Sequence, residues 1–87
     1  MNVRIIANVH HGEHRATVTR EVDLYQATED EARIIIGDAL EDIRDNPQEG
    51  VGYYLPTARA NINVIAEAVR RDGEAANGWV RVTAEEA

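Results

Sequence analysis

The residues best suited to chemistry near neutral pH lie together in the segment His10-His11-Gly12-Glu13-His14. This segment contains all three histidines of the chain and one carboxylate. Imidazole side chains bind metal ions and exchange protons near pH 7. His10, Glu13 and His14 also match H-x-x-E-H, the motif of inverted zinc peptidases. The segment therefore raises three alternatives: a peptidase, a metal-binding site or a pH-sensing contact.

The flanking residues decide the first of these alternatives, because they have the pattern of β-strands. Apolar residues recur at every second position over residues 3–9 and again, with one interruption, over residues 16–24. Two such runs around a short glycine-containing segment predict a β-hairpin with the histidines at its tip. A zinc peptidase needs this motif on a helix, and the chain has no serine or cysteine to act as another nucleophile. We therefore expect no enzymatic activity.

A metal site at the hairpin tip would use His10, His11 and His14, with Glu13 or a second chain completing the shell around zinc or nickel. Structural metal sites usually take their ligands from separate elements rather than from one turn. An exposed polar turn is therefore the favoured interpretation, and no cofactor is expected. A homodimeric domain that responds to metal or to pH through this tip is kept as the second functional hypothesis.

Two amphipathic helices are predicted after the hairpin. Thr28-Glu29-Asp30-Glu31 is a capping box, and acidic residues in the first turn suit the helix dipole. This helix should end near Asp45-Asn46, because Pro47 disfavours helix in the residue before it. A second helix should open at Leu55-Pro56-Thr57 and end at Asp72-Gly73 with a glycine cap. The inward residues are expected to be Ala32, Ile36, Ala39, Leu40 and Ile43 in the first helix and Ala58, Ile62, Ile65, Ala66 and Val69 in the second.

The order of the elements predicts the fold. Asn77-Gly78 indicates a turn before a last strand from Trp79 to Ala84, and Arg20 interrupts the second apolar run, which indicates an edge strand or a bulge. Residues 50–55 are expected to be a loop or a short irregular strand. The order ββααβ predicts a two-layer α+β domain, with a three-stranded antiparallel sheet and both helices on one face. With no repeat or linker, residues 1–87 should form a single domain.

The composition limits the classes of function. Sixteen carboxylates oppose nine arginines and no lysine, for a net charge of −7, which argues against direct binding of nucleic acid. The absence of cysteine rules out disulfides and thiolate metal sites and favours a reducing compartment. The first residues lack the apolar core of a signal peptide, and no apolar run approaches the about 20 residues of a membrane span. We therefore expect a cytoplasmic protein without a membrane partner.

Nearly all of the net charge lies in residues 28–49, where eight carboxylates oppose two arginines. Glu31, Asp38, Asp42 and Asp45 fall along one line of the first helix, roughly 21 Å long at about 1.5 Å per residue. Such a stripe is ordinarily the solvated back of a helix, but it also suits a basic partner. Imitation of DNA is the strongest form of this idea. The duplex carries one charge per about 1.7 Å, so imitation would need Glu41, Glu49 and a second protomer.

Two apolar residues are candidates for partner contact. Ile34 points away from the inward stripe of the first helix, beside the carboxylates. Trp79 shares its parity with Arg81 on the sheet face that the helices leave uncovered, with Ile6 as an apolar companion. Tryptophan and arginine are enriched where binding energy concentrates, and a self-complementary face would produce a homodimer. The alternative is that Trp79 closes the end of the core.

We expect a non-enzymatic binding protein, an inhibitor or regulator of the phage or mobile-element type, that engages a basic or nucleic-acid-binding protein. No motif identifies a family, and the hairpin followed by a capped helix is similar, in layout alone, to small antitoxin-like and phage-encoded regulators. A small structural or assembly subunit is the third alternative, after the metal- or pH-responsive homodimer. The residues expected to contact the partner are Glu31, Ile34, Asp38, Glu41, Asp42, Asp45 and Trp79.

Overall fold

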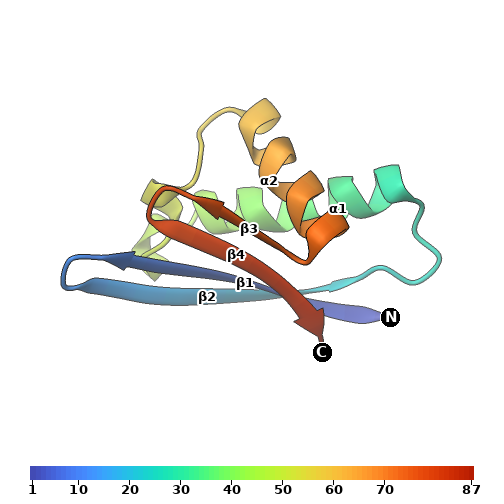
Figure 1. The fold of residues 1–87 in the computed structure, drawn as a ribbon, viewed down its shortest axis with the longest axis horizontal. Coiled ribbons are helices and arrows are strands. Elements are labelled where there is room, and N and C mark those ends of the chain that lie inside the picture. Colours follow the sequence, from blue (N-terminus) through green and yellow to red (C-terminus); the bar gives the residue numbers. More distant parts are fainter.

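The chain folds into a four-stranded antiparallel sheet with two α-helices on one of its faces (Figure 1). The computed structural model describes all 87 residues. The elements, where η is a short 3-10 helix, are β1 (Asn2–His11), β2 (His14–Asp23), α1 (Glu29–Arg44), η1 (Pro47–Glu49), η2 (Gly52–Tyr54), α2 (Arg59–Asp72), β3 (Glu74–Asn77) and β4 (Val80–Glu86). The strand order is β2-β1-β4-β3, so β2 and β3 are the edges. The chain ends lie close together, because the Ala87 N–H donates to the Asn2 carbonyl at 3.1 Å.

The predicted α+β class, the antiparallel sheet and the two helices are confirmed, but the predicted number of three strands is wrong. The additional strand is β3, and the element order is ββααββ. The β3 sequence Glu-Ala-Ala-Asn contains no β-branched or aromatic residue, so local propensity does not mark it as a strand. It is one because a two-residue turn at Gly78-Trp79, with Gly78 at a φ of 62°, folds it against β4. Trp79 therefore lies in the turn, and β4 begins at Val80.

The segments before and after α1 settle two points that the sequence left open, a bulge in the second strand and a strand between the helices. β2 is an edge strand, as Arg20 indicated, and its register with β1 continues from His14 to Asp23 without a bulge. Between the helices, residues 50–55 form no strand: η1 and η2 bring the chain back across the end of α1. The backbone there passes so close to α1 that a Cβ atom at Gly52 would lie 2.5 Å from the Arg44 carbonyl oxygen.

The helix ends follow local capping. The predicted capping box is present: Thr28 Oγ1 accepts from the Glu31 N–H at 3.1 Å, and Glu31 Oε1 accepts from the Thr28 N–H at 3.3 Å. The predicted glycine cap of α2 is also present, with Gly73 at a φ of 79°. The start of α2 was predicted too early, because its first helical residue is Arg59. Ala58 is the extended N-cap residue and is exposed, so the prediction that it points inward is wrong.

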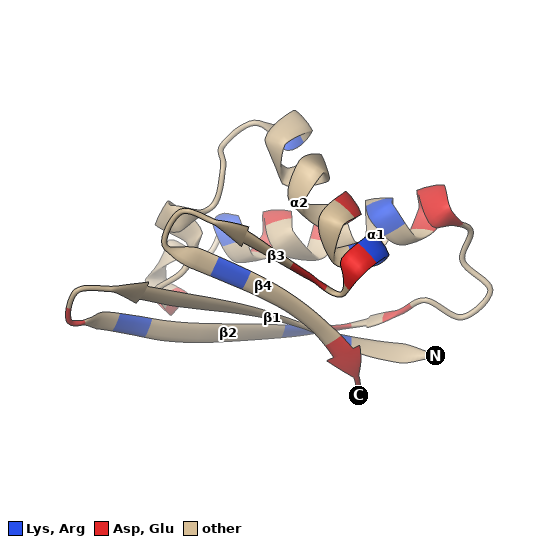
Figure 2. Cartoon of the chain, in the orientation of Figure 1, with Lys and Arg blue, Asp and Glu red and all other residues tan.

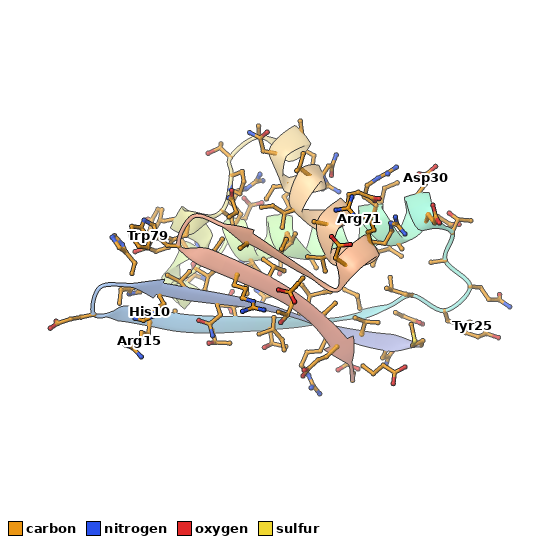
Figure 3. The ribbon with its side chains drawn as sticks, in the orientation of Figure 1. His10, Arg15, Tyr25, Asp30, Arg71 and Trp79 are labelled. Atoms are coloured by element: carbon orange, nitrogen blue, oxygen red, sulfur yellow. The ribbon has the colours of Figure 1, made fainter.

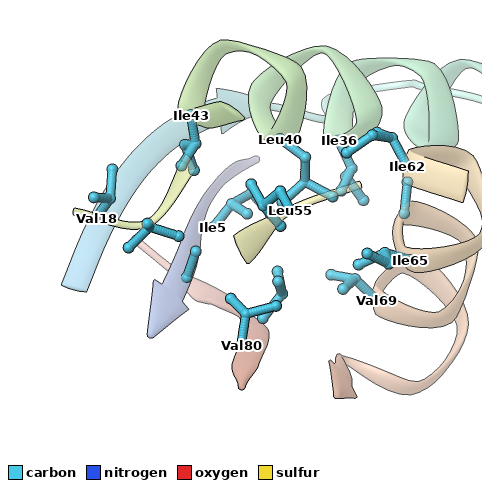
Figure 4. Packing of buried hydrophobic residues seen from close by; sticks show 14 of the residues in the cluster. Ile5, Val18, Ile36, Leu40, Ile43, Leu55, Ile62, Ile65, Val69 and Val80 are labelled. Carbon is cyan, nitrogen blue, oxygen red and sulfur yellow. The ribbon is translucent and has the colours of Figure 1, made fainter. Parts of the chain in front are cut away.

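The hydrophobic core fills the space between the helices and the covered face of the sheet (Figure 4). The four alternating residues of β1 and all five predicted inward residues of α1 are buried. None of the four aromatic residues belongs to this core, and the side chain of Trp79 is 58% exposed. The core is therefore aliphatic, and the only tryptophan is available at the surface. Neither helix is long and apolar enough to cross a membrane.

An ion-pair group joins the two helices on their outer side. Glu67 of α2 accepts two hydrogen bonds from Arg70, at 2.6 and 2.9 Å, and lies 3.5 Å from the Arg33 guanidinium of α1. The hydrogen bonds from Arg70 are the main cause that lowers the pKa of Glu67 below its ordinary value. The stability of the fold is therefore linked to the protonation of this carboxylate.

We expect Glu67→Gln to make stability less sensitive to acid. A carboxyl whose pKa is lowered by folding stabilises the fold above its unfolded pKa, and this contribution is lost as the pH falls through the folded pKa. Wild type should therefore lose more unfolding free energy than Glu67→Gln between about pH 5 and about pH 3. Urea unfolding at several pH values measures the difference. Glu86→Gln, which removes an exposed carboxylate without a side-chain partner, is the control, and parallel curves for wild type and Glu67→Gln would contradict the prediction.

Candidate functional site

The predicted partner-binding carboxylates lie along the outer side of α1, away from the sheet. We call them the acidic face, and its members are Glu31, Asp38, Glu41, Asp42 and Asp45. Figure 2 shows acidic positions along this helix, with basic positions among them. The side chains of Asp38, Asp42 and Asp45 are 67%, 59% and 60% exposed. These three side chains are therefore more accessible than that of Glu41, which is 35% exposed.

Three arginines, none of them predicted from the sequence to contact α1 carboxylates, bind the carboxylates of the acidic face. Arg20 of β2 lies 2.7 Å from Asp42 Oδ2 and also binds Glu49 of η1. Arg59 of α2 lies 2.9 Å from Asp38 Oδ1 and 2.7 Å from Glu41 Oε2. Within α1, Arg44 Nε lies 3.0 Å from Asp45 Oδ1. Glu31 has no arginine partner and serves in the capping box instead.

These arginines lie closer to the protein interior than the carboxylates that they bind. The side chains of Arg20, Arg44 and Arg59 are 25%, 18% and 35% exposed, less than the aspartates opposite them. Hydrogen bonds to Glu49 and Asp42 raise the pKa of Arg20, and the bond to Glu41 is the largest cause that raises the pKa of Arg59. Surface pairs of this kind add only about 0–1 kcal/mol each to stability. Their main effect is to hold the carboxylates in fixed, outward positions.

The same arrangement lowers the charge that the sequence alone assigned to this region. Residues 28–49 carry eight carboxylates and two arginines, or −6, and the approach of Arg20 and Arg59 reduces this to −4. The position of Arg59 depends on Gly37, since a Cβ atom there would lie 2.7 Å from Arg59 Nη2. Beside it, Ile34 is 54% exposed and its carbonyl accepts from Arg59 at 3.3 Å. An exposed apolar side chain therefore borders the acidic face.

His11, His14 and Trp79 lie at one end of the sheet, where the two hairpin turns are beside η2. His11 stacks on Trp79, with ring centroids 4.4 Å apart, and its Nδ1 lies 3.1 Å from the Tyr54 hydroxyl. His14 stacks on Tyr54 at 5.6 Å, and its Nε2 donates to the Gly50 carbonyl at 2.8 Å. We call His11, His14, Tyr54 and Trp79 the aromatic cluster. It fastens the hairpin tip to the connection between the helices.

The three histidines do not converge on a common point. His10 lies on the opposite face of the sheet from His11, and the structure has no group of three or more His, Cys, Asp or Glu side chains placed to hold a metal ion. His11 Nδ1 is bonded to the Tyr54 hydroxyl and His14 Nε2 to the Gly50 carbonyl, so each of these rings has one nitrogen left for a metal. Tyr54 could not be predicted as part of this cluster, because its contact with His11 joins residues 43 positions apart.

The face of the sheet opposite the helices is uncovered and mostly polar. A shallow hollow of about 400 Å³ lies on it, lined by Ile6, Asn8, His10, Trp79 and Arg81 among others. Figure 3 shows His10 and Arg15 at the same end of the molecule as Trp79. Trp79 thus lines this hollow and also stacks on His11.

The molecule thus presents three surfaces of different chemistry: the acidic face, the aromatic cluster and the uncovered sheet face. The acidic face keeps a net negative charge, because its five carboxylates exceed the three arginines that bind them, whereas on the uncovered face Arg4 and Arg81 are each paired with one carboxylate, Glu85 and Glu74. Comparison of the chain with protein families, curated proteins and solved structures finds no match.

Proposed function

We propose that this chain is a non-enzymatic binding protein, an inhibitor or regulator that engages the basic surface of a protein partner through its acidic face. One observation carries the proposal: Asp38, Asp42 and Asp45 project outward, and each is more exposed than the arginine that holds it. Fixed carboxylates lose less side-chain entropy when a partner binds them.

The bound carboxylates keep acceptor capacity for a partner. Arg59 contacts Oδ1 of Asp38 and Arg44 contacts Oδ1 of Asp45, and the Oδ2 atoms of both aspartates have no hydrogen bond within the chain. An ionised carboxylate accepts at about four lone-pair positions, so a guanidinium or ammonium group of the partner can bind on the outer side. The exposed Ile34 adds an apolar contact next to these charges.

A partner with a basic surface follows from this chemistry, and nucleic-acid-binding proteins are the class that carries such surfaces most extensively. Opposite charges on the two proteins would steer their encounter and raise the rate of association. Binding of this kind weakens as salt screens the charges.

We expect Asp38→Arg/Asp45→Arg to reduce partner binding at least tenfold, because two outward attractions become repulsions. These two positions leave the bridge from Arg20 to Asp42 and Glu49 intact. The measurement is affinity capture from the native cell extract at about 50 mM and about 500 mM salt. The captured protein is then purified and titrated with each variant.

The matched control is Glu13→Arg/Glu86→Arg, which changes the net charge equally at exposed carboxylates without ion pairs, away from α1. The control should retain the affinity of wild type for the purified partner. Circular dichroism verifies that both double variants are folded. If the α1 variant captures the same proteins as wild type at low salt, the acidic face is not the binding surface.

A further inference from the structure

The sheet has one long edge without a partner strand. β2 is an edge strand of ten residues, whereas β3, the other edge, has only four and lies beside α2. No proline and no bulge interrupts β2. These devices commonly protect edge strands from pairing with other chains.

The backbone groups on the outer side of β2 can be identified from the register. The Leu24 N–H donates to the Met1 carbonyl at 2.9 Å, which fixes the even-numbered residues of β2 as those that bond to β1. The N–H and C=O groups of Arg15, Thr17, Thr19 and Glu21 therefore point away from the sheet. We call residues 15–21 the outer edge.

One side chain already contacts the outer edge. Arg20 reaches from the helix side, and its Nη1 donates to the Thr19 carbonyl at 3.2 Å. A carbonyl oxygen has two lone pairs, so Thr19 can still accept from a neighbouring strand. The main bonds of Arg20, to Asp42 and Glu49, hold its guanidinium over the covered face.

We propose that the outer edge pairs antiparallel with the outer edge of a second copy of this chain, giving a homodimer with one continuous eight-stranded sheet. A two-fold axis at Val18 places Thr17 opposite Thr19 of the second copy. The same axis places Arg15 opposite Glu21 of the second copy, twice in the dimer. Opposite charges directly across two strands stabilise their pairing.

Charge complementarity favours a second copy of this chain as the pairing strand, and it also favours one register of the two strands. Arg15 forms no ion pair within the chain, and the carboxylate of Glu21 has only one partner, Asn2 Nδ2 at 3.0 Å. A shift of two residues in one direction places Arg15 opposite Thr19. A shift in the other places it opposite Asp23, which is already bound by the N-terminus at 3.3 Å and by the Tyr25 N–H at 2.9 Å. A shift of one residue does not bring the outward backbone groups together.

The pairing has a geometric consequence for the rest of the molecule. A two-fold axis that joins antiparallel strands within one sheet is perpendicular to that sheet, so the helices of both copies lie on the same side. The two acidic faces would then be neighbours on one surface of the dimer. The homodimer is inferred from the edge strand β2 only, so it does not depend on the proposed protein partner.

Sedimentation velocity of the purified chain, from about 10 µM to about 1 mM, tests the proposal, because an interface limited to one strand pair is small and weak. Wild type should form a dimer as the concentration rises. Arg15→Glu and Glu21→Arg should each raise the dimer dissociation constant about tenfold or more, because each creates two like-charge pairs. The double variant Arg15→Glu/Glu21→Arg should return to within about threefold of wild type, since it restores both pairs.

Two further variants separate pairing of the edge from other self-association. Thr17→Pro removes an outward N–H without removing a bond to β1, so it should abolish the dimer and keep the fold. Arg81→Glu makes the same charge change as Arg15→Glu on the uncovered face far from the edge, and should dimerise like wild type. If Thr17→Pro does not fold, the dissociation constants of Arg15→Glu, Glu21→Arg and their double variant decide whether the outer edge pairs. A wild type that stays monomeric at the highest concentration, or a double variant as weak as the single ones, would overturn the proposal.

Discussion

Replacing Gly52 with alanine is expected to lower the free energy of unfolding by about 3 kcal/mol, at the upper end of the usual cost of overpacking. The added Cβ would lie 2.5 Å from the Arg44 carbonyl oxygen, 2.8 Å from that of Ile43 and 3.0 Å from Pro47 Cα. These are backbone atoms, so no side-chain rotation removes the clash. The segment that contains η2 would have to move away from the end of α1.

Gly37→Ala is the matched control for this prediction. Its Cβ atom would also be too close to a neighbour, but the neighbour is Arg59 Nη2, the far end of a flexible side chain. Alanine in place of glycine inside a helix gains about 0.5–1 kcal/mol, which offsets the displacement of Arg59. Urea unfolding should show a large loss for Gly52→Ala and little change for Gly37→Ala.

The Gly52→Ala variant should also alter the aromatic cluster, because Tyr54 lies two residues further along η2. Displacement of η2 would separate the Tyr54 hydroxyl from His11 and its ring from His14. The imidazole NMR signals of both histidines report this contact, and Gly37→Ala should leave them unchanged. Equal stability losses in the two alanine variants would show that the close approach at Gly52 is easily relieved.

The parts of the fold that could be predicted from the sequence depend on residues close together in the chain. The alternation in β1, the capping box at Thr28 and the apolar stripe of α1 each lie within one element, and all three are present. Gly73 could likewise be placed as the cap of α2, because its requirement is local.

The parts that could not be predicted depend on contacts between distant residues. β3 has no strand-forming sequence and exists because β4 lies beside it. The same holds for the candidate site, where Arg20 binds a carboxylate 22 positions away and Arg59 binds one 18 positions away. Periodicity places carboxylates on one side of a helix, but it contains no information about which arginines approach them.

Arg20 illustrates how one local irregularity has a long-range cause. In the sequence it interrupts an apolar run, and this correctly indicated an edge strand. Only the structure shows why a charge is tolerated on the covered face of β2: the side chain extends past the core to Asp42 and Glu49, and three quarters of its surface is buried on the way. The acidic residues of α1 and η1 therefore also have a structural role, which is to neutralise this arginine.

The orientation of the acidic face depends on the opposite side of α1, and Leu40→Ala should reveal how strongly. Leu40 is fully buried in the core, whereas the carboxylates beside it in the sequence point outward. Removing a buried leucine side chain is expected to cost about 3 kcal/mol of unfolding free energy, within the range of about 2–5 kcal/mol for such cavities. Urea or thermal unfolding at neutral pH measures the loss.

Ile34→Ala is the control on the same helix, because Ile34 is 54% exposed. Alanine improves helix propensity at both positions, so propensity does not explain a difference between them. The Ile34 variant should stay within about 0.5 kcal/mol of wild type, as most surface substitutions do. A similar loss in both variants would mean that Ile34 is covered in solution, which would place a second chain or another contact on this side of α1. A large loss at Leu40 alone means that the core holds α1 in place while Ile34 on its outer side stays exposed in solution.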